Sequence, residues 1–358
     1  MQSSTKPCAV LAGAAALAFA LSAPAAQADD ITIGFVTHAQ GNPFVEQIVD
    51  GAKAAAKDLG VTLKVQESPG GSPEGQLKLA QGLVNAGAAG VASSMPGEGM
   101  AKSMNEIADS GVPVAQFNML SKAMKGVYVG EKSVQSGRIL GKMIVDKLGG
   151  ASAKGKVIIG NCFPGFPVLE NRATGVEESL KAAPGLTALG PYDVKVSAVD
   201  NYNHWEQLYA ANPDAVAMIG LCAPDVASLG KLNAAHGDKF VAGGYDLTAE
   251  NLAAIKGGHA YVSLGQSPFV QGYLPVVLLV EAIKSKKPTP TGFYDSGTQV
   301  VTADSVNMGP GLPKVTFAEL EKLAADPKAT ADYYKDWTKS VLAAPTPPGI
   351  QSVAAESQ

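Results

Sequence analysis

Short apolar runs alternate with longer amphipathic segments along most of the chain, and this alternation constrains the fold more than any single motif. Runs typical of buried strands and segments with helical periodicity follow one another from residue 31 onward. Parallel strands need a crossover between them, which is usually a right-handed helix, so this alternation predicts a doubly wound parallel sheet. The expected fold class is therefore α/β.

The alternation occurs twice, which predicts two similar lobes. In the first half we expect strands at 31–37, 61–66, 90–94, 112–117 and 127–129, and helices at 43–59, 72–86 and 98–110. In the second half we expect helices at 133–148, 167–182, 224–235, 248–256 and 271–284, and strands at 156–160, 194–199, 215–219, 239–243, 260–265 and 299–302. Helical segments at 317–325 and 331–342 follow, and we expect 344–358 to be frayed.

The first residues have the composition of a targeting segment. Lys6 supplies a positive charge, residues 9–21 are all apolar, and Ala26-Gln27-Ala28 matches a small-residue cleavage site. A span of a bilayer needs roughly 20 apolar residues, so this run is too short to cross one. A buried first helix is the alternative, but the run lacks a polar face. We therefore predict a cleaved signal peptide over 1–28 and a periplasmic location.

Composition and missing motifs exclude several classes of function. The formal net charge of −4 argues against nucleic acid or an anionic membrane surface as a partner, and no later segment resembles a membrane span. The chain contains no GxSxG, GxxxxGK[ST] or HExxH motif, no GxGxxG follows a predicted strand, and its four histidines lack metal-ligand spacing. We therefore predict a binding protein without catalytic residues, metal or cofactor.

Polar side chains follow the predicted strands, where doubly wound sheets bind their ligands. They are rich in amides and include one guanidinium, Arg172, and one carboxylate, Asp246. Each hydroxyl of a sugar is both a donor and an acceptor, and the aromatic Phe44 could cover an apolar sugar face. This set of groups indicates an uncharged polyhydroxy ligand.

Several segments resemble one known family in the right order along 31–302. They include Asn42-Pro43-Phe44, Tyr128-Val129-Gly130, Leu169-Glu170-Asn171-Arg172, Gly244-Tyr245-Asp246 and Gln266-Ser267-Pro268-Phe269. The chain resembles the ribose-binding-protein-like simple-sugar class of type I periplasmic binding proteins, which serve ABC transporters. The resemblance implies two lobes joined by three crossings, near Glu131, Gln266 and Gly297. The implied boundaries are 29–130 with 267–296 for the N-terminal lobe, 131–266 with 297–312 for the C-terminal lobe, and 313–358 for a helical extension with a frayed tail.

The resemblance and the positions after strands together give a set of expected ligand contacts. The set is His38, Asn42, Phe44, Ser94, Asn118, Asn171, Arg172, Tyr202, Asp246 and Gln266. Val45, Gly97 and the pair Asn118-Met119 depart from the family pattern, so we expect a ligand other than ribose, such as a polyol, inositol or another monosaccharide. The implied partners are an ABC permease and its ATPase, and we expect a monomer.

Structural roles remain open for many of these residues. Asp246 could cap the helix that begins near residue 248, and Asn42 could cap the helix that follows it. Arg172 lies inside a predicted helix, where an exposed arginine is the default. Phe44 could belong to the core, and His38 could be a buried turn residue.

Two cysteines remain after removal of the signal peptide, Cys162 and Cys222. They follow the first and third strands of the second lobe, which are neighbours in the order 2-1-3-4-5. Adjacent strands lie about 4.8 Å apart and a disulfide needs Cα atoms about 5.5 Å apart, so a bridge is possible. A pair of free thiols near the ligand is the other interpretation, and we favour the free thiols.

Two other functions use the same architecture. A chemoreceptor-linked sugar sensor or a carbohydrate-acting enzyme would fit the scaffold, although the sequence offers no paired acid and base. The effector lobe of a repressor would need a helix-turn-helix segment where this chain has its signal peptide. The capture of a simple sugar or polyol by hinge closure, for delivery to an ABC importer, is the main prediction.

Overall fold

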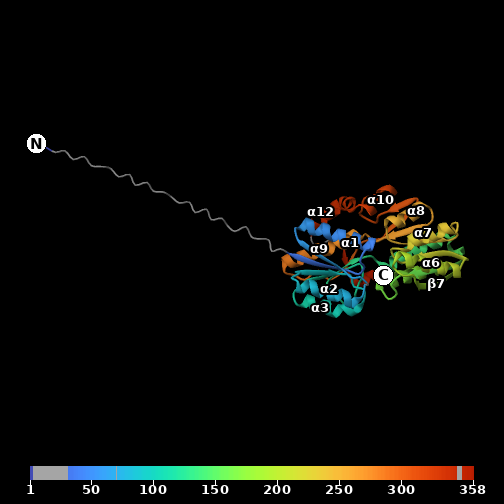
Figure 1. The fold of residues 1–358 in the computed structure, drawn as a ribbon, viewed down its shortest axis with the longest axis horizontal. Coiled ribbons are helices and arrows are strands. Elements are labelled where there is room, and N and C mark those ends of the chain that lie inside the picture. Colours follow the sequence, from blue (N-terminus) through green and yellow to red (C-terminus); the bar gives the residue numbers. More distant parts are fainter. Residues whose placement is uncertain (3–30, 70, 345–348) are drawn as a thin grey trace. The chain divides into compact units, whose positions relative to one another are not determined.

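The computed structural model describes residues 1–2, 31–69, 71–344 and 349–358. The expected signal peptide, apart from its first two residues, lies outside the described residues. The chain divides into the units Met1–Asp30 and Ile31–Gln358, and the helices and strands of the described residues belong to the second unit. Two sheets covered by helices form its two lobes, as the sequence predicts (Figure 1).

The first sheet has the strand order β14-β11-β5-β4-β3-β1-β2. Its strands are β1 (Thr32–Thr37), β2 (Thr62–Glu67), β3 (Gly90–Ser93), β4 (Val114–Phe117), β5 (Val127–Gly130), β11 (Gly292–Asp295) and β14 (Ile350–Gln351). The helices of this lobe are α1 (Pro43–Leu59), α2 (Pro73–Asn85), α3 (Ala101–Asp109) and α9 (Pro268–Ser285). All pairs are parallel except β11 with β14, so the first five strands have the expected order 2-1-3-4-5.

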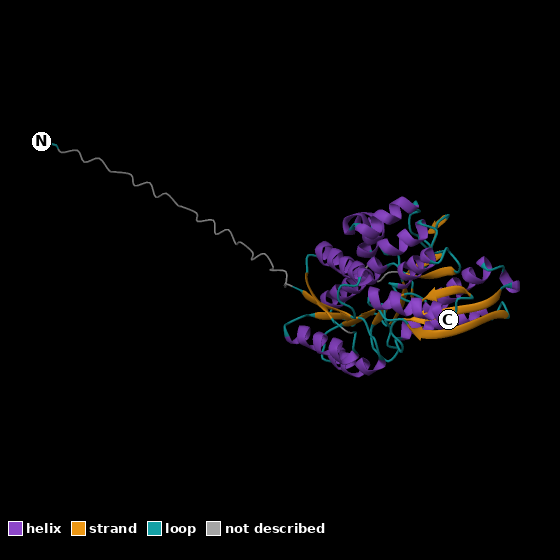
Figure 2. Cartoon of the chain, turned by 45° about the vertical axis from the view of Figure 1, so that its right-hand side comes forward, coloured by secondary structure: helices purple, strands orange, loops and turns teal. Residues whose placement is uncertain are grey.

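The second sheet repeats this plan in the order β13-β12-β10-β9-β8-β6-β7. Its strands are β6 (Lys154–Asn161), β7 (Gly185–Asp193), β8 (Ala215–Gly220), β9 (Val241–Tyr245), β10 (Val262–Gly265), β12 (Gln299–Thr302) and β13 (Ser305–Asn307). Its helices are α4 (Ser133–Lys147), α5 (Pro167–Leu180), α6 (Ala198–Ala211), α7 (Asp225–Ala235) and α8 (Ala249–Lys256). Figure 2 shows the strands of both lobes flanked by helices.

One expected strand is wrong. The sequence predicts a strand at 194–199, but β7 ends at Asp193 and α6 begins at Ala198. The side chain of Ser197 accepts a hydrogen bond from Asp200 N and so caps α6. Because β7 is an edge strand whose side chains are mostly exposed, it lacks the apolar run by which buried strands are recognised.

The chain passes between the sheets three times before the C-terminal extension, which leads from β13 of the second sheet back to β14 of the first. It leaves the first sheet after β5, returns between β10 and α9, and leaves again between β11 and β12. Hydrogen bonds tie these crossings together: Ser296 N donates to Gly130 C=O at 2.7 Å, and Ser296 Oγ donates to Gln266 C=O at 2.8 Å. The three crossings therefore lie side by side.

Glycines allow the closest helix contact in the first lobe. A Cβ on Gly272 of α9 would lie 1.8 Å from the carbonyl oxygen of Ile48 in α1, a separation that atoms cannot adopt. The backbones of α1 and α9 therefore touch directly. This contact orients α1, whose first turn carries Phe44.

The C-terminal extension packs on both lobes through α10 (Phe317–Ala325), α11 (Pro327–Tyr333) and α12 (Lys335–Ala343). Leu320 joins an apolar cluster with Leu252 and Met308, in the second lobe. The Tyr334 ring stacks on Phe269 of α9, with 4.8 Å between centroids. In Figure 1, α10 accordingly lies beside α8, and α12 lies toward α1 and α9.

The expectation of a frayed end is wrong for 349–358, while 345–348 lie outside the described residues. Residues Ile350–Gln351 pair antiparallel with β11 of the first sheet. The buried Glu356 accepts hydrogen bonds from Ser133 Oγ and Asn171 Nδ2, both in the second lobe. This order depends on contacts with distant elements, which local periodicity does not encode.

Candidate functional site

A cavity lies where the carboxyl ends of strands from both sheets meet. It has an empty volume of about 480 Å³, including open solvent at its mouth. The first lobe lines it from the segments after β1 and β4, and the second lobe lines it from the segments after β6, β8 and β9 and from α5. Its position is the one that doubly wound sheets use for ligands. We refer to it as the cleft cavity.

Seven of the ten expected contacts line the cleft cavity. They are His38, Asn42, Phe44, Asn118, Arg172, Asp246 and Gln266.

The other three lie elsewhere. The fully buried Ser94 donates from Oγ to Gln76 Oε1 at 2.9 Å, and Asn171 donates to Glu356. Tyr202 packs on the second-lobe core from α6, with the Lys231 ammonium 4.4 Å from its ring centroid. Each of these side chains is therefore occupied by a structural partner.

Three cavity side chains form one hydrogen-bonded chain across the lobes. Asn118 Nδ2 donates to Gln266 Oε1 at 3.1 Å, and Gln266 Nε2 donates to Asp246 Oδ1 at 2.9 Å. Asn118 belongs to the first lobe, Asp246 to the second, and Gln266 to the crossing between them. Gln271 at the start of α9 also accepts from Asn118 and donates to the Gln266 backbone, so the amide orientations are fixed on several sides.

Asp246 does not cap the next helix. The N-cap of α8 is Thr248, whose side chain accepts from Asn251 N. Asp246 itself has a φ of 72°, in the left-handed region that non-glycine residues rarely adopt, and it lines the cleft cavity. Burial raises the pKa of this carboxyl, and the charge of Arg172 and the hydrogen bond from Gln266 partly offset that rise.

Arg172 is buried, contrary to the default for a helical arginine. Its guanidinium donates from Nε to Glu131 Oε1 at 2.6 Å and from Nη1 to Leu221 C=O at 2.8 Å. It also lies over the Tyr245 ring, 3.8 Å from the centroid. Glu131 is fully buried at the first crossing, and its burial raises its pKa while Arg172 lowers it in part. Sequence reasoning missed this partner because Glu131 precedes Arg172 by a helix and a strand.

On the first-lobe side of the cavity, Asn42 and Phe44 each have a structural role and also line the cavity. Asn42 caps α1, since Phe44 N donates to Asn42 Oδ1 at 3.0 Å, and it also lines the cavity. Phe44 belongs to the core cluster of the first lobe and lines the cavity as well. Burial lowers the pKa of His38 to about 4, so its imidazole is neutral at pH 7.

An aromatic pair on the second-lobe wall was not among the expected contacts. The rings of Phe163 and Phe166 stack with 4.6 Å between centroids, and both line the cleft cavity. A signal was present in the sequence, because both follow a predicted strand and flank the turn at Pro164-Gly165. With Phe44, the cavity has aromatic side chains from both lobes.

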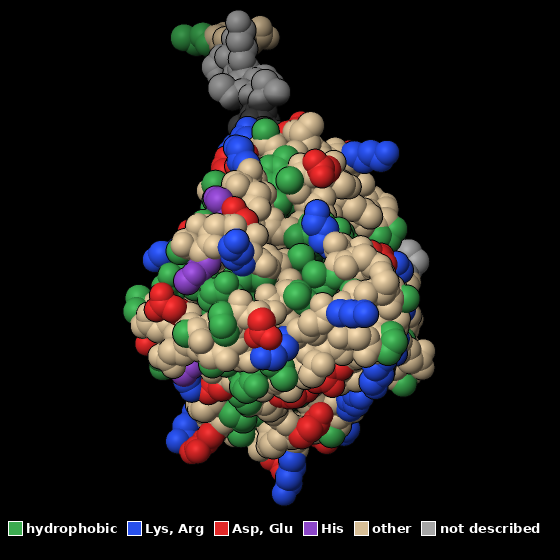
Figure 3. Space-filling model, turned by 90° about the vertical axis from the view of Figure 1, so that its right-hand side faces the viewer, with side chains coloured by type: hydrophobic (Ala, Val, Ile, Leu, Met, Phe, Trp, Pro, Cys, Tyr) green, Lys and Arg blue, Asp and Glu red, His purple; other side chains and the backbone are tan. Residues whose placement is uncertain are grey.

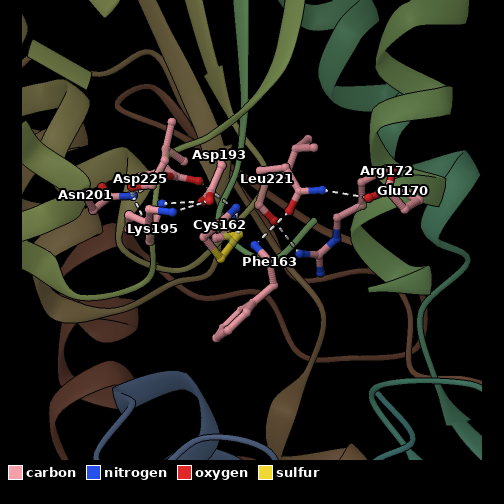
Figure 4. The surroundings of a disulfide bond; sticks show 12 residues. Cys162, Phe163, Glu170, Arg172, Asp193, Lys195, Asn201, Leu221 and Asp225 are labelled. Atoms are coloured by element: carbon pink, nitrogen blue, oxygen red, sulfur yellow. Dashed lines mark hydrogen bonds and ion pairs between the residues drawn. A yellow bond between two sulfur atoms is a disulfide. The ribbon is translucent and has the colours of Figure 1, made fainter. Parts of the chain in front are cut away.

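Cys162 and Cys222 form a disulfide, so the favoured interpretation as free thiols is wrong. Their Cα atoms lie 6.1 Å apart because β6 and β8 are paired neighbours in the sheet. Both cysteines line the cleft cavity. Figure 4 shows the disulfide among its neighbours, with Cys162 labelled.

A second cavity adjoins the first. Phe44, Asp246 and Gln266 line both cavities, and the second is also lined by Leu320, Tyr334 and other residues of the C-terminal extension. The extension therefore lies directly behind residues of the cleft cavity.

Several kinds of site are absent from the described part of the chain. Within 31–69, 71–344 and 349–358, no group of His, Cys, Asp and Glu side chains could hold a metal ion. None of the helices in these ranges is long and apolar enough to cross a membrane. The face in Figure 3 carries basic and acidic side chains interspersed, without a patch of one sign.

The groups that line the cavity match a neutral molecule with many hydroxyl groups. Amide and carboxylate groups offer acceptors, amide and guanidinium groups offer donors, and the rings of Phe44, Phe163 and Phe166 can cover apolar C–H faces. The buried charges of Arg172 and Glu131 compensate each other, so neither of these two groups needs an opposite charge on the ligand.

The sequence is similar to those of known proteins. The chain is 26% identical over 285 residues to the ribose import binding protein RbsB of Haemophilus influenzae, covering 77% of this chain and 93% of that protein. It is 22% identical over 298 residues to the xylose/arabinose-binding protein XylF of Sulfolobus acidocaldarius, covering 76% and 71%.

A solved structure shows the same fold. It is that of an ABC transporter solute-binding protein from Burkholderia graminis in complex with D-arabinose, with a TM-score of 0.72 and 23% identity over 77% of this chain and 96% of that chain. The family model described as periplasmic binding protein domain matches residues 33–287. Because this match covers more than half of the sequence, the chain belongs to the periplasmic binding protein domain family.

Proposed function

We propose that this protein captures a neutral simple sugar or polyol in the cleft cavity and delivers it to an ABC importer. One observation carries the proposal: buried donors, acceptors and aromatic rings from both lobes converge on a single cavity at the carboxyl ends of both sheets. The relatives named for ribose and for xylose and arabinose support a monosaccharide. Inositol, a cyclic polyol, belongs to the polyols of this proposal.

Ligand contacts come from both lobes and from a crossing. Asn42, Phe44 and Asn118 hold the ligand from the first lobe, with His38 beside them, and Arg172 and Asp246 hold it from the second. Gln266 bridges the two sets at the hinge. The acceptors Asp246 and Asn118 and the donor Arg172 match hydroxyl groups, and no bond of the ligand is made or broken.

Entry of the ligand requires the lobes to separate. Arg172, Asp246 and Gln266 are only 2–3% exposed, so a sugar cannot reach them while the lobes are in this arrangement. The three crossings serve as the hinge, and contacts of both lobes with one ligand favour closure. The closed form is then recognised by the membrane permease, whose ATPase drives uptake.

The proposal includes the location and state of the protein. Residues 1–28 direct it to the periplasm and are removed, and the mature protein acts as a monomer. The apolar run at 9–21 and the site Ala26-Gln27-Ala28 support the signal peptide.

A ligand-stabilisation panel tests the proposal. The melting temperature of the protein is measured with pentoses, hexoses, polyols and inositols, and at least one is expected to raise it. Asp246→Ala is expected to weaken binding of that compound at least tenfold, which is about 1.4 kcal/mol, because hydroxyl groups lose a buried acceptor.

Two variants serve as controls. Asp246→Asn keeps the shape and an acceptor for Gln266, so it separates the loss of charge from the loss of packing. Asp304→Ala changes an exposed carboxylate outside the cavity and should bind like the wild type. No stabilisation by any compound in the panel would refute sugar capture, and unchanged binding by Asp246→Ala would remove Asp246 from the site.

A further inference from the structure

The disulfide lies in the wall of the proposed ligand site. Cys162 and Cys222 follow neighbouring parallel strands, line the cleft cavity and are 7% and 4% exposed. The last ladder bond between these strands runs from Leu221 N to Gly160 C=O at 3.1 Å. Beyond it, Cys162 N donates to Cys222 Sγ at 3.1 Å, so a hydrogen bond to sulfur joins the two loops in addition to the disulfide.

The loop that begins at Cys162 carries the rings of Phe163 and Phe166, which we call the aromatic wall. Phe163 and Phe166 stack on each other and line the cavity. The Phe166 ring also reaches the opposite lobe, since a Cβ on Gly71 would lie 3.3 Å from its Cζ. In Figure 4, the ring of Phe163 points away from Asp225, on the far side of the disulfide. The position of this loop therefore decides where the aromatic wall stands.

The loop that contains Cys222 orients the guanidinium. The carbonyl of Leu221 accepts from Arg172 Nη1 at 2.8 Å. Cys222 N donates to Asp225 Oδ2 at 2.8 Å, and Asp225 Oδ1 accepts from Trp205 Nε1 at 2.9 Å. This loop is thus anchored to α6 on one side and to the other loop by the disulfide.

We propose that the Cys162–Cys222 disulfide is a positioning element for ligand binding. It fixes the aromatic wall and the partner of Arg172 relative to each other, so the oxidised protein binds sugar more tightly than the reduced protein. The inference rests on the proposed function. Without the bridge, the two loops are joined to each other only through the sheet, so they are more mobile in the free protein. Ordering them on binding then costs conformational entropy, which weakens the affinity for the sugar.

Two treatments remove the bridge. Dithiothreitol opens it by thiol–disulfide exchange: the two thiols of the reagent become a cyclic disulfide, and two electrons and two protons pass to the sulfurs of Cys162 and Cys222, which become thiols. The variant Cys162→Ala/Cys222→Ala removes it without a reductant. Ile255→Ala is the matched control, because Ile255 is fully buried in the same lobe but does not line the cavity.

Titration calorimetry at 15 °C, where all forms are folded by circular dichroism, tests the inference. The probe is whichever of D-ribose, D-xylose, D-arabinose and D-allose most stabilises the oxidised wild type. We expect the Kd to rise at least tenfold in the reduced protein and in the double variant, and to stay within twofold in Ile255→Ala. A merely structural bridge would lower the melting temperature of the double variant and leave its Kd unchanged.

The outcomes separate the two proposals. If none of the four sugars stabilises the oxidised protein and the wider panel also fails, the proposed function is refuted and this inference falls with it. If a sugar binds the oxidised protein and the double variant with Kd values within twofold, only the positioning role is refuted.

Discussion

The replacement Arg172→Met tests the buried ion pair between the first crossing and α5. Arg172 and Glu131 side chains are 3% and 0% exposed, and their closest nitrogen–oxygen distance is 2.5 Å. Methionine fills a similar volume but leaves the Glu131 carboxylate without a counter-charge. Removal of one member of a buried pair typically costs about 3–5 kcal/mol, because the remaining charge stays desolvated.

Two further contacts place the expected loss within that range. The Leu221 carbonyl loses its donor, and the Tyr245 ring loses the guanidinium that lies 3.8 Å from its centroid. Since methionine keeps part of the packing on the ring, we expect the free energy of unfolding to fall by about 4 kcal/mol. That corresponds to a change of roughly three orders of magnitude in the unfolding equilibrium.

The loss should depend on pH. Without Arg172, burial of Glu131 and the nearby charge of Asp246 are no longer offset by the guanidinium, so its folded-state pKa rises further above the unfolded value of 4.5. The folded state then binds more protons than the unfolded state, so stability falls as pH rises through this window. The variant is therefore expected to be closer to the wild type at pH 5 than at pH 8.

Urea unfolding followed by circular dichroism at the two pH values measures both effects. The double variant Glu131→Gln/Arg172→Met removes both charges and should recover much of the loss, since a neutral pair carries no uncompensated charge. A loss below about 1 kcal/mol for Arg172→Met, or a double variant as unstable as the sum of the single variants, would contradict this account of the pair.

Three other perturbations have defined outcomes. The pKa of His38 is about 4 in the folded state and about 6.5 in the unfolded state, so the unfolded state binds more protons between these pH values. Acidification from pH 6.5 to 4 should therefore lower the free energy of unfolding by roughly 3 kcal/mol in the wild type and by less in His38→Gln, as measured by urea unfolding. An equal loss in both proteins would exclude this histidine as the cause. Gly272→Ala should lower stability by about 2–3 kcal/mol because its Cβ would clash with the carbonyl of Ile48. Gly82→Ala, whose Cβ would lie in open space within a helix, should raise stability by up to about 1 kcal/mol. Thermal melts that rank the two variants in the opposite order would disprove the close contact of α1 and α9. Glu356→Ala should loosen the C-terminus by about 2 kcal/mol, seen as faster amide exchange in β14, and unchanged exchange would show that this carboxylate does not hold the strand.

Local pattern was sufficient for most of the fold. Buried strands such as β1 and β4 and amphipathic helices such as α1 have strong periodicity, and their alternation permits few topologies. The exposed edge strand β7 and the two-residue β14 lack an apolar run, so the sequence did not reveal them. A strand at the edge of a sheet that is mostly exposed or very short has little of the apolar pattern by which a strand is predicted from sequence.

The sequence also placed most of the candidate site, because the carboxyl ends of parallel strands meet at one edge. His38, Asn118, Asp246 and Gln266 each follow a strand and do line the cleft cavity. The roles of Ser94 and Asn171 could not be read in this way, since each is occupied by a partner distant in sequence. The residue type determines which groups a side chain can bond to, but only the tertiary packing determines which partner it meets.

By itself, then, the order of apolar and polar residues determined two doubly wound lobes and a polar edge between them, because periodicity and strand direction are local properties. The tertiary structure decided the rest. The bridge between Cys162 and Cys222, the pairing of Arg172 with Glu131 and the docking of the C-terminal extension on both lobes all join segments far apart in the chain. Such contacts form only once the sheets have brought their ends together, and no local pattern specifies them.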